Sequence, residues 1–167
     1  LGSSGVLIGE QATDDAPDLT ELHRQLVVPT DRRMWALFHA LRTGMSVDEL
    51  HGLTHIDPWF LTQFAEIVAL EREASLVEFR DMSAELLRTL KQAGFADGDI
   101  ARLCGADEDV VRDRRAELGI VPAYKLVDTC AAEFEASTPY YYSTYDDEDE
   151  LRPAKKERIV ILGGGPN

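Results

Sequence analysis

The sequence has few cysteines, few basic residues and no long apolar run. Its two cysteines, Cys104 and Cys130, lie in different segments and match no metal-ligand spacing, so we expect buried, reduced thiols. Only 17 Lys and Arg stand against 31 Asp and Glu, and the net charge of −14 disfavours nucleic acid and anionic membranes as partners. No apolar run approaches the ~18 residues of a membrane span, and no signal-peptide pattern opens the chain. We therefore expect a cytoplasmic location.

Helical periodicity extends from about residue 18 to residue 118 and predicts six short helices joined by tight turns. The expected N-terminal caps are Thr30, Ser46 (in a capping box with Glu49), Asp57 (followed by Pro58), Ser83 and Asp107. The expected C-terminal stops are Gly44, Gly94 and Gly119. The expected apolar faces are Met34, Leu37, Phe38 and Leu41 in one helix and Phe60, Phe64, Ile67 and Val68 in another. The fold class that follows is an all-α, irregular multihelical array.

The helical region contains an internal repeat with an offset of fifty residues. LFHALRTGMSVDELHGLTHIDPWFL begins at Leu37, and LRTLKQAGFADGDIARLCGADEDVV begins at Leu87. The glycine stop, the short helix and the aspartate cap recur in register. This indicates two copies of a helix-turn-helix-like unit.

A helix-turn-helix pattern raises the alternative of a nucleic-acid-binding module. The last helix of the second unit, residues 108–118, carries three arginines against four acidic residues, which is not a phosphate-seeking surface. His51 and His55 are four residues apart, but Gly52 and the turn at Asp57 interrupt the continuous helix that joint metal ligation would need. We interpret the helices as packing elements and expect no metal site and no catalytic residues.

Aromatic residues are the strongest candidates for an interaction surface. Trp35 and Trp59 each lie beside an apolar stripe and widen it beyond what one core needs. Core packing is the first interpretation, and a protein–protein interface is the second, because aromatic anchors dominate such surfaces. The predicted core or interface anchors of the helices are Trp35, Trp59, Phe60 and Phe64.

The C-terminal part differs from the helical region. From residue 120 to residue 157 the periodicity disappears, and this segment holds all five tyrosines and the acidic run Asp146–Glu150. Tyrosine-rich segments are poor candidates for disorder, so we predict an extended strap in which Tyr140, Tyr141 and Tyr142 pack on a neighbouring domain. The final RIVILGGGPN is typical of one β-strand entering a glycine loop, which leaves a nucleotide-binding fragment using Gly163–Gly165 as an alternative.

Several of these motifs resemble one family. YKLVDTCAAEF from Tyr124, TPYYYSTY from Thr138 and ILGGGPN from Ile161 resemble the carbamoyl phosphate synthetase large subunit, and LRTGMSVDELHGLTHIDPWFL resembles its helical domain. The resemblance covers residues 17–167. It implies an oligomerization, or connection, domain followed by the first strand of the second half of that enzyme.

The resemblance also implies an activity for the intact parent protein. That family makes carbamoyl phosphate from bicarbonate, glutamine-derived ammonia and ATP, in arginine and pyrimidine biosynthesis, and uses Mg and K ions. A glutaminase small subunit and the adjacent ATP-grasp halves are the implied partners, together with self-association. No ligand of ATP or of a metal can be transferred to a residue of this chain, so we expect the fragment itself to be non-catalytic and without cofactors.

These observations predict four segments. Residues 1–16 are expected to be linker or non-native residues, and residues 17–119 a helical oligomerization domain. Residues 120–157 are expected to form the Tyr-rich acidic strap, and residues 158–167 the first strand and glycine loop of a truncated α/β domain.

Overall fold

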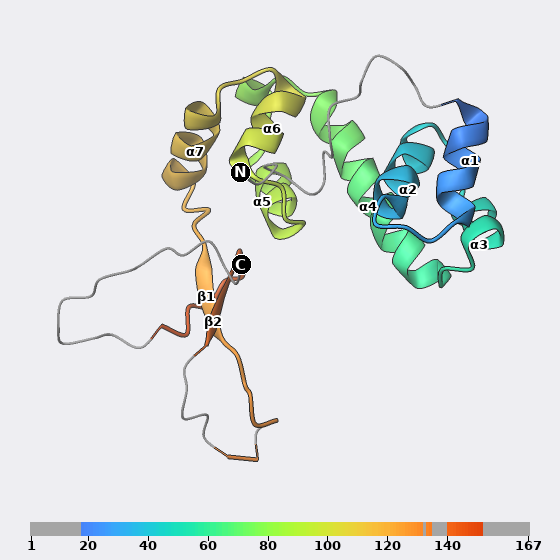
Figure 1. Cartoon of the computed structure of the whole chain (residues 1–167). Coiled ribbons are helices and arrows are strands. Elements are labelled where there is room, and N and C mark those ends of the chain that lie inside the picture. The colour runs from blue at the N-terminus through green and yellow to red at the C-terminus, as the bar shows by residue number, and fades with distance from the viewer. Residues whose placement is uncertain (1–17, 132, 135–139, 152–167) are drawn as a thin grey trace. The chain divides into compact units, whose positions relative to one another are not determined.

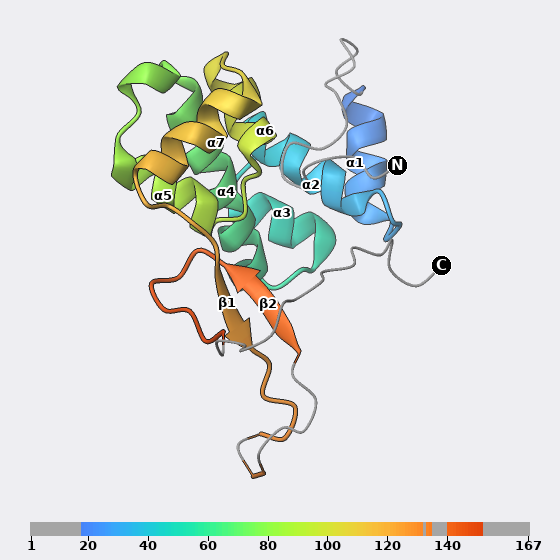
Figure 2. The same ribbon diagram turned by 90° about the vertical axis from the view of Figure 1, so that its left-hand side faces the viewer.

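A computed structural model describes residues 18–131, 133–134 and 140–151 of the chain (Figures 1 and 2). The α-helices in these ranges are α1 (Leu19–Val27), α2 (Arg33–Arg42), α3 (Val47–Thr54), α4 (Pro58–Ser75), α5 (Ala84–Gln92), α6 (Asp97–Cys104) and α7 (Glu108–Glu117). A 3₁₀ turn, η1 (Phe79–Asp81), precedes α5, and the strands β1 (Ala123–Leu126) and β2 (Tyr141–Thr144) follow α7. The chain divides into a helical unit ending at Ile120 and a second unit beginning at Val121, and each is described separately.

The prediction of a mostly helical fold is confirmed. The described helices include α1, which the six predicted helices omitted. This helix begins after Asp18, whose side chain accepts a hydrogen bond from the Thr20 amide, and it buries only Leu22 and Leu26. Nine residues with two buried apolar positions give a weak periodic signal.

The repeat is confirmed in the backbone of the helical unit. The turn after α2 contains Gly44 with φ +102°, and the turn after α5 contains Gly94 with φ +91°. The amide one residue beyond each glycine bonds back into its helix, Met45 to Ala40 at 3.0 Å and Phe95 to Leu90 at 3.1 Å. Both are helix-ending turns in which a left-handed residue satisfies the last carbonyls. The two helix-turn-helix units are therefore alike in their hydrogen bonds as well as in their sequence.

The long helix α4 belongs to both halves of the helical unit. Figure 1 shows α1, α2 and α3 gathered around one end of α4, and α5 and α6 near its other end. The first half buries Leu22, Leu26, Leu37, Phe38, Leu41, Leu50, Leu61 and Val68. The second half buries Leu87, Leu90, Phe95, Ile100, Val111 and Ile120. Apolar residues at matching positions of the two repeat units are therefore buried in both halves of the helical unit.

Most predicted helix ends are correct, and two caps are not. The capping box is present: the Glu49 amide donates to the Ser46 hydroxyl at 3.3 Å, and the Ser46 amide donates to the Glu49 carboxylate at 2.8 Å. Asp57 and Ser83 also accept the expected amide bonds at α4 and α5. Thr30 does not cap α2. Its hydroxyl accepts from the Arg32 amide in a local turn, and the helix begins three residues later, at Arg33.

Asp107 occupies the N-cap position of α7 without a side-chain cap bond. Two side chains predicted on apolar faces are also exposed, Met34 at 43% and Phe60 at 54%.

The second unit contains a two-stranded antiparallel ribbon where the sequence predicted no regular structure. β1 pairs with β2 in a register that places Tyr124 opposite Ser143 and Leu126 opposite Tyr141. The aromatic and β-branched composition of residues 140–145 is a strand signal that the prediction of an irregular strap overlooked. The strand predicted at Ile159–Leu162 and the loop Gly163–Gly165 lie outside the described residues.

Candidate interaction surface of the helical unit

An exposed aromatic pair lies at the start of α4. Asp57 caps the helix by accepting a hydrogen bond from the Trp59 amide at 2.9 Å, and Pro58 occupies the first helical position. The rings of Trp59 and Phe60 meet edge to face, with centroids 4.9 Å apart and planes at 87°. Trp59 is 63% exposed and Phe60 is 54% exposed. The rigid cap and the mutual ring contact hold two large apolar side chains at the surface, which is the chemistry of an interface anchor.

The repeat places a further apolar side chain at the position equivalent to Phe60. Val110 of α7 lies fifty residues after Phe60 and is 51% exposed. The residues that follow each of them, Leu61 and Val111, are fully buried. Both repeat units therefore use the same helix start to bury one residue and expose its predecessor.

The other predicted anchors have different surroundings. Phe64 is partly buried and packs on Phe38, with centroids 5.1 Å apart, so it serves the core of the first half. Trp35 of α2 is partly buried. Tyr141, at the start of β2, is partly buried, whereas Tyr140 just before the strand and Tyr142 within it are 59% and 52% exposed. Of the four helical anchors, Trp59 and Phe60 are the two brought together at the surface.

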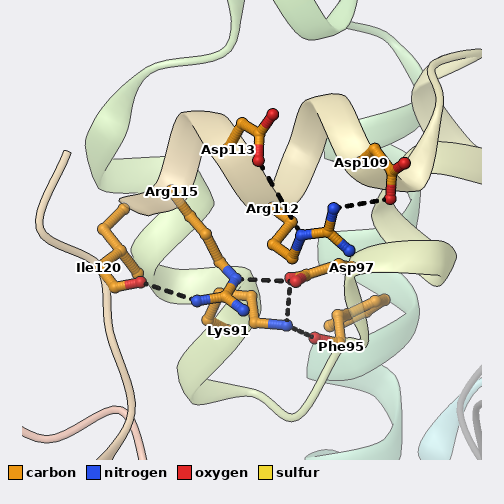
Figure 3. A network of polar contacts seen from close by, with 8 residues as sticks. All are labelled: Lys91, Phe95, Asp97, Asp109, Arg112, Asp113, Arg115 and Ile120. Atoms are coloured by element: carbon orange, nitrogen blue, oxygen red, sulfur yellow. Dashed lines mark hydrogen bonds and ion pairs between the residues drawn. The ribbon is translucent and has the colours of Figure 1, made fainter. Parts of the chain in front are cut away.

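A buried charge network fixes α5, α6 and α7 against one another (Figure 3). Asp97, at the start of α6, accepts from Lys91 of α5 and from Arg115 of α7, each at 2.8 Å. Lys91 also donates to the Phe95 carbonyl at 2.7 Å, and Arg115 donates to the Ile120 carbonyl at 3.3 Å. The three charged side chains are between 5% and 16% exposed. One carboxylate thus bonds two cations that little solvent reaches.

The network changes the ionisation of its carboxylate. Burial is the largest single influence on Asp97 and by itself opposes ionisation, but the hydrogen bonds and positive charges of Lys91 and Arg115 together outweigh it. The pKa of Asp97 is therefore lowered. The role that follows is structural, because all three charges are used to join helices.

A second ion pair joins α2 to α4. Arg42 donates to both carboxylate oxygens of Glu71, at 2.8 and 2.7 Å, and its guanidinium lies 5.6 Å from the centroid of Phe38. The next residue of α4, Arg72, donates to the carbonyls of Leu41 and Arg42 at the end of α2. These contacts satisfy helix-end carbonyls and fix the orientation of the two helices. Sequence reasoning missed both charge clusters, since their partners come from separate helices.

An open cleft of about 800 Å³ lies between η1 and the α6–α7 turn. Phe79, Cys104 and Val110 contribute apolar surface to it, and acidic and basic side chains form much of its remaining lining. The Cys104 thiol donates to the Ala74 carbonyl at 3.4 Å, and burial raises the pKa of this thiol. Both cysteines are free and only partly buried, whereas the sequence predicted buried thiols.

The histidines singled out from the sequence take part in turn geometry. His51 Nδ1 lies 2.7 Å from the Ile56 carbonyl oxygen, and His55 ends α3 in the left-handed conformation with φ +56°. Among the described residues, no group of three or more His, Cys, Asp or Glu side chains could hold a metal ion. No helix within those ranges is long and apolar enough to cross a membrane.

The structure thus defines a helical-repeat domain with an exposed aromatic pair. Residues 3–119 match the family model described as carbamoyl-phosphate synthetase large chain, oligomerisation domain. The chain belongs to this family. The resemblance suggested by the sequence is thereby confirmed, and the matched region begins well before residue 17, where the motif comparison had placed the start of the resemblance.

Curated relatives give the same assignment over nearly the whole chain. The carbamoyl phosphate synthase large chain of Synechocystis sp. is 50% identical over 152 residues, covering 90% of this chain and 14% of the relative. The proteins of the same name from Vibrio cholerae and Streptomyces coelicolor are 44% and 46% identical, covering 100% and 99% of this chain. The chain spans only 14–15% of the length of these relatives. The comparisons support neither the nucleotide-binding nor the nucleic-acid-binding alternative.

Proposed function

We propose that the helical unit associates with further copies of itself through a surface centred on Trp59 and Phe60. The observation that carries this proposal is the exposed edge-to-face pair at the capped start of α4. Burying two aromatic side chains contributes strongly to association, because such residues supply large apolar area at low conformational cost. Trp35 and Phe64 are partly buried, and Phe64 packs on Phe38, so neither is the centre of this surface.

The proposal extends to the longer protein. The name shared by the relatives supports a role as a connector in a carbamoyl phosphate synthase large chain, an ATP-dependent ligase. In that protein, bicarbonate, glutamine-derived ammonia and ATP would be handled by adjacent ATP-grasp halves together with a glutaminase subunit. The present chain would contribute self-association and spacing, without catalytic residues or cofactors of its own. The tyrosines at 140–142 would pack on a neighbouring domain.

The test is sedimentation equilibrium of the 167-residue chain and of a Trp59→Ser, Phe60→Ser variant. We expect the dissociation constant for self-association to rise at least about tenfold, which corresponds to a loss of about 1.4 kcal/mol. Leu76→Ser is the matched control, because Leu76 is an 85% exposed apolar residue just after the other end of α4. The proposal fails if the aromatic variant and the control associate equally.

A further inference from the structure

The two edges of the β1–β2 ribbon differ. The Val127 amide donates to the Tyr140 carbonyl at 2.8 Å, which identifies Val127 and Tyr140 as a hydrogen-bonded pair. Hydrogen-bonded and non-hydrogen-bonded pairs alternate along an antiparallel ladder. The backbone groups of Tyr124 and Leu126 therefore point away from β2, and those of Tyr141 and Ser143 point away from β1.

The outer edge of β1 is covered by the acidic run. The Glu150 amide donates to the Tyr124 carbonyl at 2.9 Å, and the Glu150 carboxylate accepts from the Leu126 amide at 2.7 Å. Asp149 accepts from the Tyr124 amide at 3.4 Å. Lys125 lies 3.6 Å from the Glu150 carboxylate. These contacts replace the bonds that a third strand would make, so this edge is closed to a further strand.

The outer edge of β2 has no such cover within the described residues. Tyr141 and Ser143 belong to the non-hydrogen-bonded pairs, so the ladder uses neither residue's amide or carbonyl, and no hydrogen bond from another described segment reaches these groups. β2 itself carries no charge and no proline. One ribbon face adds exposed aromatic surface, since Tyr140 and Tyr142 are more than half exposed. An uncharged strand with free outward amides and carbonyls is a template for the addition of another strand.

The occupant that these observations favour is an extended segment from another part of the longer polypeptide. The oligomerisation family model ends at residue 119, before the ribbon, whereas the Vibrio cholerae relative matches 100% of this chain and extends far beyond it. A two-stranded ribbon is marginally stable alone, and three strands or a packed face are needed for independent stability. A strand from a second copy is the competing occupant, and the concentration dependence of exchange described below distinguishes it.

We propose that the outer edge of β2 receives an extended segment of the longer polypeptide outside residues 1–167, pairing with Tyr141 and Ser143. The segment places uncharged or apolar side chains against Tyr140 and Tyr142. The Asp149–Glu150 cover makes the ribbon one-sided, so that a strand is accepted at β2 and refused at β1. This inference rests on the proposed function, in which residues 1–167 are one part of a carbamoyl phosphate synthase large chain.

Hydrogen–deuterium exchange of the peptide spanning residues 140–145 tests the pairing, in the 167-residue chain and in the full-length polypeptide. Two additional amides, those of Tyr141 and Ser143, are expected to exchange slowly in the full-length polypeptide. Equal exchange in the two proteins would overturn the proposal. Slow exchange that depends on the concentration of the 167-residue chain would also overturn it, by showing that a second copy is the occupant.

Two substitutions separate edge pairing from ribbon folding. Ser143→Pro removes only an outward amide, so it should leave the 167-residue chain's exchange at the β1–β2 ladder unchanged. In the full-length polypeptide the same change should make the Tyr141 amide exchange fast, whereas Ser143→Ala should keep it slow. If Tyr141 stays slow in the proline variant, the proposal is wrong. Failure of the full-length polypeptide to form carbamoyl phosphate from bicarbonate, ammonia and ATP would instead count against the proposed function and would leave the edge pairing unaffected.

Discussion

Replacing Asp97 by asparagine should destabilise the helical unit strongly. The change removes the carboxylate that bonds both Lys91 and Arg115, while Lys91 is only 5% exposed and keeps the Phe95 carbonyl as an acceptor. Loss of one partner from a buried ion pair costs about 3–5 kcal/mol. Because Arg115 is 16% exposed and can regain some hydration, we expect the lower end of that range, about 3 kcal/mol. For a unit of this size the midpoint of thermal unfolding should fall by about 12–24 °C.

The assay is urea unfolding followed by circular dichroism of the helices. Asp109→Asn is the matched control, because Asp109 pairs with Arg112 at 2.9 Å on the exposed face of α7 (Figure 3). Exposed pairs contribute little, so the control should change the free energy of unfolding by less than about 0.5 kcal/mol. Equal effects of the two substitutions would refute the structural role of the buried network.

The same substitution has a defined pH dependence. The pKa of Asp97 is lower in the folded chain than in the unfolded chain, where an aspartate titrates near about 3.9. Its contribution is therefore complete above about pH 4 and is lost as the pH falls through the lowered folded value. The stability difference between the original chain and Asp97→Asn should be constant near neutral pH and should shrink below about pH 4. A difference that did not shrink in acid would contradict the proposed ionisation of Asp97.

Two further pairs of substitutions test the packing and the turns. Leu61→Ala should lower the free energy of unfolding by about 2–5 kcal/mol, because Leu61 is fully buried. Phe60→Ala should change the free energy of unfolding of the monomer little. Equal losses of stability in chemical denaturation would contradict the assigned burial. Gly44→Ala should cost about 1–3 kcal/mol through backbone strain at φ +102°, while Gly52→Ala, inside α3 with open space around it, should stabilise by up to about 1 kcal/mol. The midpoint of thermal unfolding should fall in Gly44→Ala and rise in Gly52→Ala. A change of the same sign in both variants would contradict a left-handed Gly44 and a helical Gly52.

Capping residues and glycine stops predicted most helix ends correctly, whereas the burial of individual side chains depends on how the helices pack. Ser46, Asp57 and the glycine stops act on residues within one turn of themselves, so their effect can be read from a short stretch of sequence. A short stretch of sequence cannot show whether Phe60 or Leu61 is the buried residue, since both lie on a broad apolar arc of α4. Only the positions of the surrounding helices decide which of the two is covered.

Long-range pairing explains the elements that the sequence did not predict. Lys91 and Asp97 come from adjacent helices, but Arg115 joins them from eighteen residues beyond Asp97. β1 and β2 pair across fifteen or more residues, as in Leu126 with Tyr141, so neither strand shows its partner locally. In the candidate surface, the sequence predicted Trp59 and Phe60 as core or interface anchors, whereas their edge-to-face contact and their exposure depend on the fold.

Sedimentation equilibrium of the 167-residue chain, over a concentration series at low and high salt, tests the central claim most directly. We predict an average mass that rises with concentration above the monomer mass of 18.6 kDa. The association should strengthen at high salt, because salt screens the repulsion between chains of net charge −14 and leaves the aromatic contact intact. A strictly monomeric chain at every concentration and salt would contradict self-association through the helical unit.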